Sequence, residues 1–462
     1  MLKRYIGDKA FYRHVIAIAL PIIIQNLIMN FVSMLDNIMV GQLATAQISA
    51  VTIINNNLMF IFNICLFGGA AGAGIFTTQF HGSGDSDGVR YTFRFKLFIC
   101  MFLTVVGVAA FLLFPDQLIN LYLQGDGDPQ LAADTLYYSK VYLNVMIFGM
   151  LPFAITNAYA STLRECSQPM VPMVASLVAT GVNLVFNYIL IFGHLGLPAM
   201  GVAGAAVATV LSRYVEMAIV MIWTHTHTQR NPFAKGLYRS LYIPRGLLRS
   251  ITIKGMPLLV NEFLWTVGMA FVNQCYSTCG LAVVPALSIS TTIINLTAVI
   301  YRSLGNTVGI IMGQMMGADR GKDEIMDANR KMLALSAFSG VVFGILTAAS
   351  SGVFPRLYNT TDDIRLLATR LILISAVCMP LQGYSFPVYF TLRAGGKTLV
   401  TFLFDCGAIW ALYLPIAFSL SRFTSLSILA IFALCNATDL VKCIAGYLLI
   451  KRGDWIQNLA EQ

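Results

Sequence analysis

Long apolar segments dominate the chain, and short polar or Gly/Pro-rich breaks separate them. A helix that spans a membrane needs about 20 mostly apolar residues, so each of these segments is long enough to cross a bilayer. Several are longer, and we expect those helices to tilt or to protrude from the hydrocarbon. The twelve predicted spans are 14–39, 48–79, 93–115, 135–162, 170–193, 200–223, 250–276, 281–313, 328–354, 364–392, 398–420 and 424–450. The pattern therefore predicts an all-α polytopic membrane protein with 12 transmembrane helices.

The composition excludes the soluble and disordered classes. Hydrophobic residues make up 57% of the 462 positions, and charged residues make up 11%. An average soluble protein carries roughly 25% charged residues, so this chain has too few polar groups to cover a water-exposed surface. The nine cysteines are scattered through apolar segments without a zinc-ligand spacing, and we expect small buried side chains. The first apolar run lacks a cleavage site, so we expect a retained span rather than a signal peptide.

The positions of Lys and Arg predict the orientation of the spans. If both termini are cytoplasmic, the inside segments hold 22 of these residues and the outside segments hold five. Short loops rich in Lys and Arg stay in the cytoplasm, so the chain is predicted to be N-in and C-in. The net charge of +9 then follows from topology, and no nucleic-acid partner is expected.

The longest basic connection divides the twelve spans into six and six. Pro21 and Pro257 begin corresponding spans, and Phe114-Pro115 and Phe354-Pro355 end corresponding spans. An even number of spans gives both halves the same orientation, so two parallel six-helix repeats are predicted. In transporters with such repeats, the substrate site lies where the halves meet. The predicted parts are an N-terminal lobe over 1–224, a cytoplasmic linker over 225–249 and a C-terminal lobe over 250–462.

The first span carries a polar face with one carboxylate. An ionisable side chain inside a bilayer is costly and is by default a functional residue, so we hypothesise that Asp36 couples transport to an ion. The amides are also typical of interhelical hydrogen bonds, which leaves a structural role open for them. Pro21 removes a backbone hydrogen bond and is predicted to kink this helix. The face comprises Gln25, Asn26, Asn30, Ser33, Asp36 and Asn37, of which Gln25, Asn26 and Asn30 are candidate substrate ligands.

Two amides on the fifth span complement the carboxylate of Asp36. Asn183 and Asn187 lie four residues apart and so share a helix face. A carboxylate opposite two amide oxygens can hold a desolvated Na⁺ or can take and release a proton. Plain helix packing is the alternative. The predicted ion-coupling set is Asp36, Asn183 and Asn187, which would also be the metal ligands if Na⁺ is the coupling ion.

Candidate substrate ligands lie in the second half. Glu262 and Thr266 share a face of the seventh span with Trp265 beside them, and a carboxylate next to an aromatic ring favours an organic cation. A structural pair is the alternative for Glu262. Asp405 is interpreted either as a cavity residue or as a partner of Lys442 or Arg302. Gln382 and Tyr389 on the tenth span complete the predicted substrate set.

Other charged residues and motifs are interpreted as structural. Arg213 and Glu216 are three residues apart in one span and can neutralise each other, as can Asp439 and Lys442. The sequence contains no P-loop and no recognisable catalytic set, so an enzyme is not expected. No cofactor is expected beyond a transported H⁺ or Na⁺.

Several segments resemble the multidrug and toxic compound extrusion (MATE) transporters. They are the run from Pro21 through Asp36-Asn37-Ile38-Met39-Val40-Gly41-Gln42-Leu43, the segment Gly201-Val202-Ala203-Gly204-Ala205-Ala206, and Leu392-Arg393-Ala394-Gly395-Gly396-Lys397-Thr398. The resemblance covers the whole chain. It implies a MATE-like fold and a multi-pass protein of the bacterial inner membrane. It also implies an antiporter that expels small amphipathic, often cationic compounds in exchange for H⁺ or Na⁺.

The resemblance further implicates a bent first helix, with a proline matching Pro21 and an acid matching Asp36, in coupling. Many members have an Asp where this chain has Asn187, and that departure weakens a Na⁺ site. A lipid-linked saccharide flippase of the same superfamily and a major-facilitator transporter are the alternatives. Five intramembrane acids against three bases disfavour an anionic pyrophosphate cargo. We expect a monomer surrounded by lipid.

Overall fold

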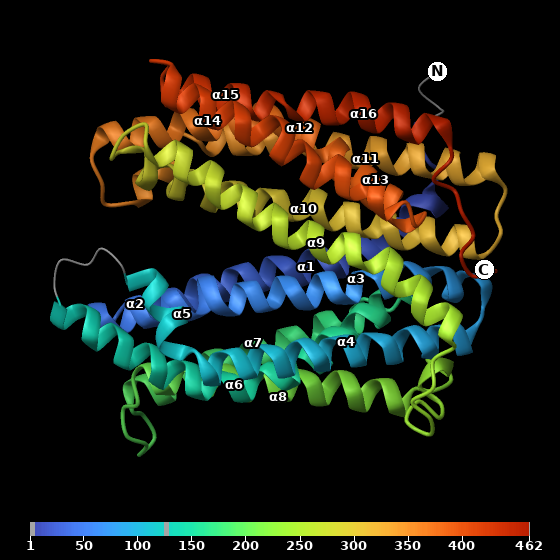
Figure 1. Ribbon diagram of the computed structural model, residues 1–462, viewed down its shortest axis with the longest axis horizontal. Coiled ribbons are helices and arrows are strands. Elements are labelled where there is room, and N and C mark those ends of the chain that lie inside the picture. The colour runs from blue at the N-terminus through green and yellow to red at the C-terminus, as the bar shows by residue number, and fades with distance from the viewer. Residues whose placement is uncertain (1–4, 124–128, 462) are drawn as a thin grey trace. The chain divides into compact units, whose positions relative to one another are not determined.

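The computed structural model describes residues 5–123 and 129–461, and the regular secondary structure within these ranges is helical (Figure 1). The side chain of Asn37 also lies outside the described part. The α-helices are α1 (Lys9–Val40), α2 (Thr45–Ile53), α3 (Phe60–Ser83), α4 (Ser86–Leu113), α5 (Pro115–Leu123), α6 (Pro129–Glu165), α7 (Met170–Phe192), α8 (Val202–Thr226), α9 (Arg245–Ser277), α10 (Val283–Gly317), α11 (Lys322–Ser350), α12 (Asp362–Ala394), α13 (Thr398–Phe402), α14 (Leu414–Phe423), α15 (Ile428–Ala437) and α16 (Asp439–Arg452). Short 3₁₀ turns are η3 (Pro232–Ala234) and η4 (Phe354–Leu357), and π-helical segments are η2 (Ile54–Met59), η5 (Leu403–Gly407) and η6 (Ile409–Tyr413).

Twelve helices within the described ranges are long and apolar enough to cross a membrane, which confirms the predicted number of spans. Three of these spans are formed by consecutive segments: α2 with η2 and α3, α13 through α14, and α15 with α16. The helices extend further than the apolar runs, because backbone hydrogen bonds continue into polar flanks. The helix α1, for example, begins at Lys9 rather than at position 14, after the Asp8 carboxylate accepts from the Phe11 N–H at 2.7 Å.

The chain forms two compact units. The C-terminal unit comprises Met1–Ile23, Thr78–Gly84 and Ile253–Gln462, and the N-terminal unit comprises Ile24–Thr77 and Asp85–Thr252. Each unit has its own apolar core, so each has its own packing centre. The helices α1 and α3 each contribute residues to both units.

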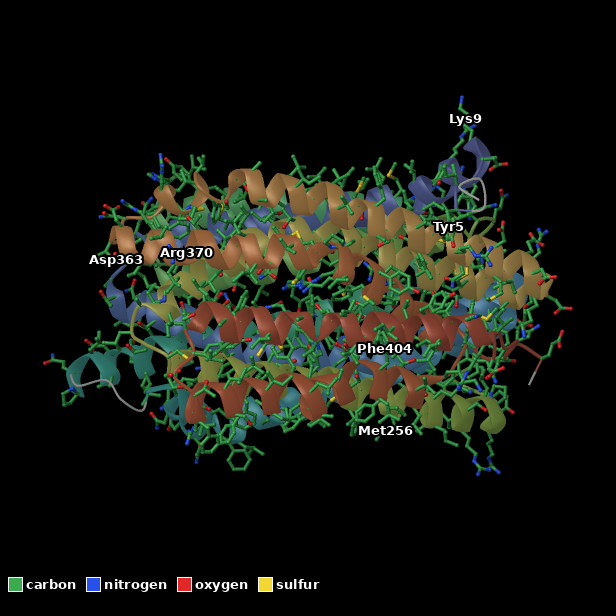
Figure 2. The ribbon with its side chains drawn as sticks, turned by 90° about the horizontal axis from the view of Figure 1, so that it is seen from above. Tyr5, Lys9, Met256, Asp363, Arg370 and Phe404 are labelled. Atoms are coloured by element: carbon green, nitrogen blue, oxygen red, sulfur yellow. The ribbon has the colours of Figure 1, made fainter. Side chains whose placement is uncertain are left out.

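The C-terminal unit has two clearly opposed ends. Tyr5 and Lys9 lie at one end, and Asp363 and Arg370, from the first turns of α12, lie at the other (Figure 2). The Lys/Arg count predicts that the first end is cytoplasmic and that the second end is outside. The unit therefore provides positions at which this predicted orientation can be tested.

Single cysteines introduced into a cysteine-free background should report the orientation. Cysteines at Thr45 and Asp362 are expected to react with an impermeant maleimide added outside cells, as is one at Asp126, which lies outside the described residues. Cysteines at Ser86, Lys235 and Lys322 are expected to react only after the cytoplasm is opened. The opposite labelling pattern would overturn the N-in, C-in orientation.

Candidate functional site

The first polar centre lies in the N-terminal unit, where α1 faces α7. Asn187 Nδ2 donates to Asp36 Oδ1 at 2.7 Å and to Asn183 Oδ1 at 3.1 Å. Asn183 is 5% exposed and Asn187 is 2% exposed, whereas Asp36 is half-buried. The structure therefore brings all three predicted ion-coupling residues into one hydrogen-bonded cluster.

The Asn183 amide also lies against Asp36, and the identity of its facing atom decides how the two side chains interact. One of its terminal atoms lies 2.8 Å from Asp36 Oδ1 and 3.3 Å from Oδ2. If this atom is the nitrogen, the amide donates to an ionised carboxylate. If it is the oxygen, two oxygens face each other at hydrogen-bond distance, and a proton or a cation must lie between them. The second orientation also lets Asn183 Nδ2 donate to Thr209 Oγ1 at 3.4 Å.

A chain of neutral polar groups supports this centre from behind. Thr209 on α8 bonds to the Tyr142 hydroxyl on α6, and Asn55 Nδ2 donates to that hydroxyl at 2.9 Å. Asn55 belongs to the π-helical segment η2, and such segments occur frequently at functional sites. Tyr142 and Asn55 were not predicted, although the run Asn55-Asn56-Asn57 in an apolar span was a usable signal.

The expected pair Arg213 and Glu216 belongs to a larger charged group in this unit. Arg213 interacts electrostatically with Asp36 as well as with Glu216, and its guanidinium lies 3.9 Å from the centroid of the Phe153 ring. Arg164 on α6 also acts on Glu216. Arg213 therefore supplies a positive charge that opposes binding of a second cation near Asp36.

The three candidate substrate ligands on α1 have different surroundings. Gln25 is 6% exposed, and its Nε2 lies 3.4 Å from the Pro172 carbonyl while its Oε1 accepts from Arg164. These contacts tie α1 to α6 and α7. Asn26 is half-buried and Asn30 is exposed. Their roles as substrate ligands stay predictions.

The second polar centre lies in the C-terminal unit. Tyr389 donates from its hydroxyl to Glu262 Oε1 at 3.4 Å, and Asn261 Nδ2 lies 3.4 Å from the same hydroxyl. Asn261 Nδ2 also donates to Asp405 Oδ2 at 3.3 Å, and Lys442 Nζ donates to Asp405 Oδ1 at 2.9 Å. Asp405 belongs to the π-helical segment η5. The structure therefore joins the predicted residues Glu262, Tyr389 and Asp405 through Asn261, which was missed although it directly precedes Glu262.

Each centre contains an amide oxygen without a hydrogen-bond partner among the described residues. They are Asn187 Oδ1 beside Asp36 and Asn261 Oδ1 beside Asp405, and both atoms are buried. A buried polar atom without a partner is costly, so an orphaned oxygen points to a ligand that is bound during function. In both asparagines the amide nitrogen donates to the carboxylate, and the amide oxygen is left for a proton donor or a cation.

The remaining predicted residues of this unit lie in separate contacts. Gln382 accepts from the Tyr301 hydroxyl at 2.7 Å and donates to Asp439 at 3.2 Å. The Thr266 hydroxyl donates to the Glu262 backbone carbonyl at 2.9 Å. Trp265 is half-buried and adjoins these residues along α9. Asp439 thus has Gln382 as its hydrogen-bond partner, and the ion pair of Lys442 is with Asp405 rather than with Asp439 as the spacing suggested.

Removing Lys442 is expected to lower the stability of the protein, because Asp405 loses its ion-pair partner. Lys442→Met leaves a largely buried carboxylate without its counter-charge and should cost about 3 kcal/mol of stability. Lys442→Met combined with Asp405→Asn removes both charges and should recover most of that loss. Thermal unfolding of both variants in detergent measures the difference. Equal destabilisation by the single and double changes would show that the pair does not stabilise this unit.

Among the described residues, no group of three or more His, Cys, Asp or Glu side chains is arranged to hold a metal ion. Asp36 is the acid of the first centre, and its possible cation ligands are otherwise amide oxygens. This arrangement offers a monovalent site and lacks the charge that divalent ions need.

The chain is similar to a single family over most of its length. The family model described as MatE matches residues 21–189 and 257–418. The probable multidrug resistance protein NorM of Thermotoga maritima is 23% identical over 444 residues, which is 96% of this chain and 93% of that protein. The probable multidrug resistance protein YoeA of Bacillus subtilis is 25% identical over 423 residues, 89% of this chain and 87% of that protein.

Solved structures share the fold. A crystal structure of the Vibrio cholerae MATE transporter VcmN superposes with a TM-score of 0.85 at 16% identity, over 98% of this chain and 99% of that chain. A multidrug resistance MATE family transporter in an outward-facing conformation gives a TM-score of 0.85 at 18% identity, over 97% of each chain. The expected MATE-like fold is confirmed.

Proposed function

The chain belongs to the MATE family of membrane transporters, and we propose that it is a secondary active antiporter. It exports small amphipathic organic cations in exchange for H⁺ or Na⁺, in keeping with relatives that are named probable multidrug resistance proteins. The observation that supports this proposal best is the cluster of Asp36, Asn183 and Asn187 on facing helices. Its place of action is the bacterial inner membrane, where the chain works as a monomer.

Ion binding at Asp36 changes which of the surrounding polar groups have a hydrogen-bond partner. The empty carboxylate accepts from both Asn187 and the Asn183 nitrogen. Protonation turns one carboxyl oxygen into a donor, which the Asn183 oxygen accepts at 2.8 Å after the amide turns over. The freed Asn183 nitrogen then faces Thr209. Binding therefore alters the contacts between α1, α7 and α8, and a ligand shifts a conformational equilibrium only through such unequal contacts.

The geometry favours H⁺ over Na⁺ as the coupling ion. When the Asn183 oxygen faces Asp36, its 2.8 Å distance from Oδ1 fits an O–H···O hydrogen bond from a protonated carboxyl group. A second carboxylate would strengthen a Na⁺ site, but this chain has Asn187 in that position. Arg213 adds a positive charge to the surroundings. Na⁺ also binds carboxylate oxygens, so both ions compete for Asp36.

Helix α1 transmits the change at Asp36. It contains Pro21, whose missing N–H removes one backbone hydrogen bond and so creates a flexible point 15 residues before Asp36. Contacts made by the N-terminal part of α1 lie in the C-terminal unit, and those of Asp36 lie in the N-terminal unit. Bending at Pro21 thus accompanies the exchange between inward-open and outward-open states.

The second centre recognises the cationic cargo. Glu262 supplies negative charge, and Tyr389 and Trp265 supply aromatic surface, which together suit an organic cation. Asp405 is already neutralised by Lys442. Glu262 has no such direct ion pair with Lys442 and is the acid that we assign to the cationic substrate, although it also interacts electrostatically with Arg393.

Transport by purified protein in liposomes tests the proposal. An imposed pH gradient should drive a cationic dye such as ethidium against its own gradient, and dye addition should cause proton movement in the opposite direction. A Na⁺ gradient serves as the second arm. Dye movement that only equilibrates concentrations, without either ion gradient, would contradict an antiporter.

A further inference from the structure

The connection between α8 and α9 carries an extreme local charge. Positions 217–261 contain six Lys and Arg residues and no Asp or Glu. The whole chain, in contrast, has 21 acids against 30 bases. Both flanking helices are spans, so this connection lies at the surface of the membrane. Lys and Arg are expected in a cytoplasmic connection, but the absence of Asp and Glu leaves their charge uncompensated within it.

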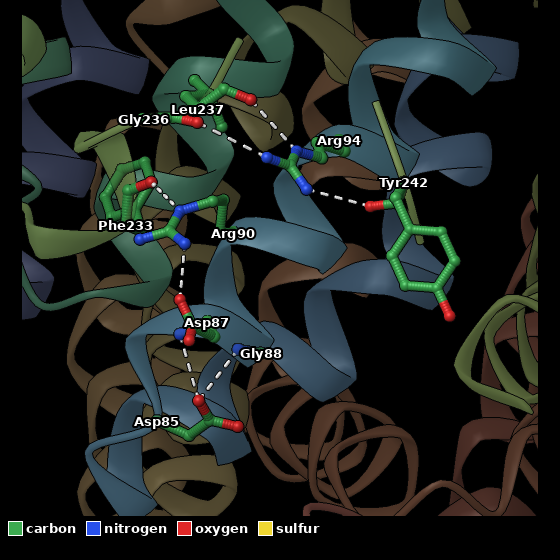
Figure 3. A network of polar contacts seen from close by, with 9 residues as sticks. All are labelled: Asp85, Asp87, Gly88, Arg90, Arg94, Phe233, Gly236, Leu237 and Tyr242. Carbon is green, nitrogen blue, oxygen red and sulfur yellow. Dashed lines mark hydrogen bonds and ion pairs between the residues drawn. The ribbon is translucent and has the colours of Figure 1, made fainter. Parts of the chain in front are cut away.

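The connection is folded against the N-terminal unit rather than extended. Arg94 Nε donates to the Leu237 carbonyl at 3.0 Å, its Nη1 to the Tyr242 carbonyl at 2.9 Å and its Nη2 to the Gly236 carbonyl at 3.5 Å. Arg90 donates to the Phe233 carbonyl at 3.1 Å. Figure 3 shows both arginines of α4 reaching into this turn. The loop backbone is therefore bonded to α4 at four carbonyl groups.

Buried side chains hold the inner side of the loop. Asn231 is 0% exposed, Phe233 is 3% exposed and Leu237 is 1% exposed. The Tyr159 hydroxyl lies 2.9 Å from His225 Nε2 and also bonds to the Tyr238 hydroxyl. These contacts determine which residues of the segment are left to face outward.

The outward side combines cations with apolar and aromatic groups. Leu241 is 63% exposed and Tyr242 is 61% exposed, and Tyr238 is 54% exposed even though its hydroxyl bonds inward to Tyr159. Arg245, Leu248 and Arg249 share a face of the first turns of α9, because they are three and four residues apart. We call the exposed side chains of residues 238–249 the linker surface. Its cations are Arg239, Arg245 and Arg249.

The nearby acids do not neutralise the linker surface. Asp87 pairs with Arg90, and Asp85 caps α4 by accepting from the Asp87 and Gly88 N–H groups at 3.0 Å (Figure 3). Across residues 5–123 and 129–461, Arg239, Arg245 and Arg249 form no ion pair with an Asp or Glu. Their charge remains available to a ligand.

We propose that the linker surface binds the headgroups of anionic phospholipids in the adjoining leaflet. Tyrosine and arginine side chains at the end of a span suit the interface, where the rings lie among headgroups and the guanidinium groups bind phosphate. Each Lys or Arg near an anionic membrane surface strengthens binding about five-fold. Docking through Arg90 and Arg94 holds the three arginines close to the bilayer, so α8 and α9 are anchored where the halves of the chain connect.

Lipid titration of the full-length protein in detergent tests this proposal. The midpoint of thermal unfolding should rise as phosphatidylglycerol is added, and less with phosphatidylcholine, since a ligand that binds the native state stabilises it. Arg239→Gln/Arg245→Gln/Arg249→Gln should weaken the apparent affinity for phosphatidylglycerol roughly a hundred-fold and leave that for phosphatidylcholine unchanged. These side chains are exposed, so unfolding without added lipid should match the wild type.

Two further variants distinguish lipid binding at the linker surface from a general effect of positive charge on the protein. Arg239→Lys/Arg245→Lys/Arg249→Lys keeps the charge and should retain binding within about five-fold. Lys9→Gln/Arg13→Gln/Lys451→Gln removes the same charge from exposed positions elsewhere and should bind like the wild type. An equal loss in that control would overturn the proposal, as would unchanged binding by the triple Gln variant. Full competition by inorganic phosphate would assign the site to soluble anions instead of lipid.

Discussion

Asp36→Asn is expected to lower ion-driven efflux roughly a hundred-fold while leaving substrate binding measurable. The replacement keeps an oxygen that accepts from Asn187 at 2.7 Å, so the contact between α1 and α7 should survive. It removes the group that can bind H⁺ or Na⁺. Efflux against a gradient then has no ion to drive it. Proteoliposomes with an imposed pH gradient measure the rate, and dye binding in detergent measures affinity.

The matched control is Asp116→Asn. Asp116 is a half-exposed acid of α5 in the same unit, paired with Lys140, and its loss should leave efflux near the wild-type rate. Uphill transport by Asp36→Asn at the wild-type rate would show that another acid binds the coupling ion, and Glu262 and Asp405 would be the next residues to test.

Added Na⁺ should inhibit proton-driven efflux by the wild type, because both ions need the same carboxylate.

Glu262→Gln is expected to impair efflux of cations far more than efflux of neutral compounds. Gln keeps the oxygen that accepts from the Tyr389 hydroxyl, so the local fold should persist. A hydrogen bond or contact to a charged group contributes about 2 kcal/mol, so the half-saturating concentration of a cation should rise roughly thirty-fold. Dose–response curves for a cationic and a neutral dye of similar size give the comparison.

A second glutamate provides the control for this selectivity. Glu324 lies at the start of α11, is 55% exposed and pairs with Arg320. Glu324→Gln should affect neither class of dye. If Glu262→Gln reduces efflux of cations and neutral compounds equally, Glu262 has a structural role and the cation is recognised elsewhere.

The sequence predicts the fold well because the bilayer imposes it. Each span must be about 20 apolar residues long, so the segments could be counted directly. Their ends could not be placed, since helices such as α1 continue through polar residues that the apolar pattern excludes. The π-helical segments η2 and η5 could not be predicted either, because they depend on packing that no local pattern encodes.

The candidate site was predictable where helical spacing places residues on one face. Asn183 and Asn187 share a face by spacing, and an acid in a facing span was a natural partner. Contacts between distant segments were not predictable. The choice of Asp405 rather than Asp439 as the ion-pair partner of Lys442 depends on how η5 lies against α16. Asn261 was not predicted either, because its contacts are with Tyr389 and Asp405 on distant segments.

If Asp36 binds the coupling ion, substrate binding should release that ion, and the release can be measured. Saturating dye is added to detergent-solubilised protein in weakly buffered solution, and released H⁺ is measured with a pH indicator and released Na⁺ with a radioactive tracer. The wild type is expected to release one ion more per molecule than Asp36→Asn, because the carboxylate gives up its ion as the cargo binds. Equal release by the two proteins would contradict the assignment of Asp36 as the coupling carboxylate.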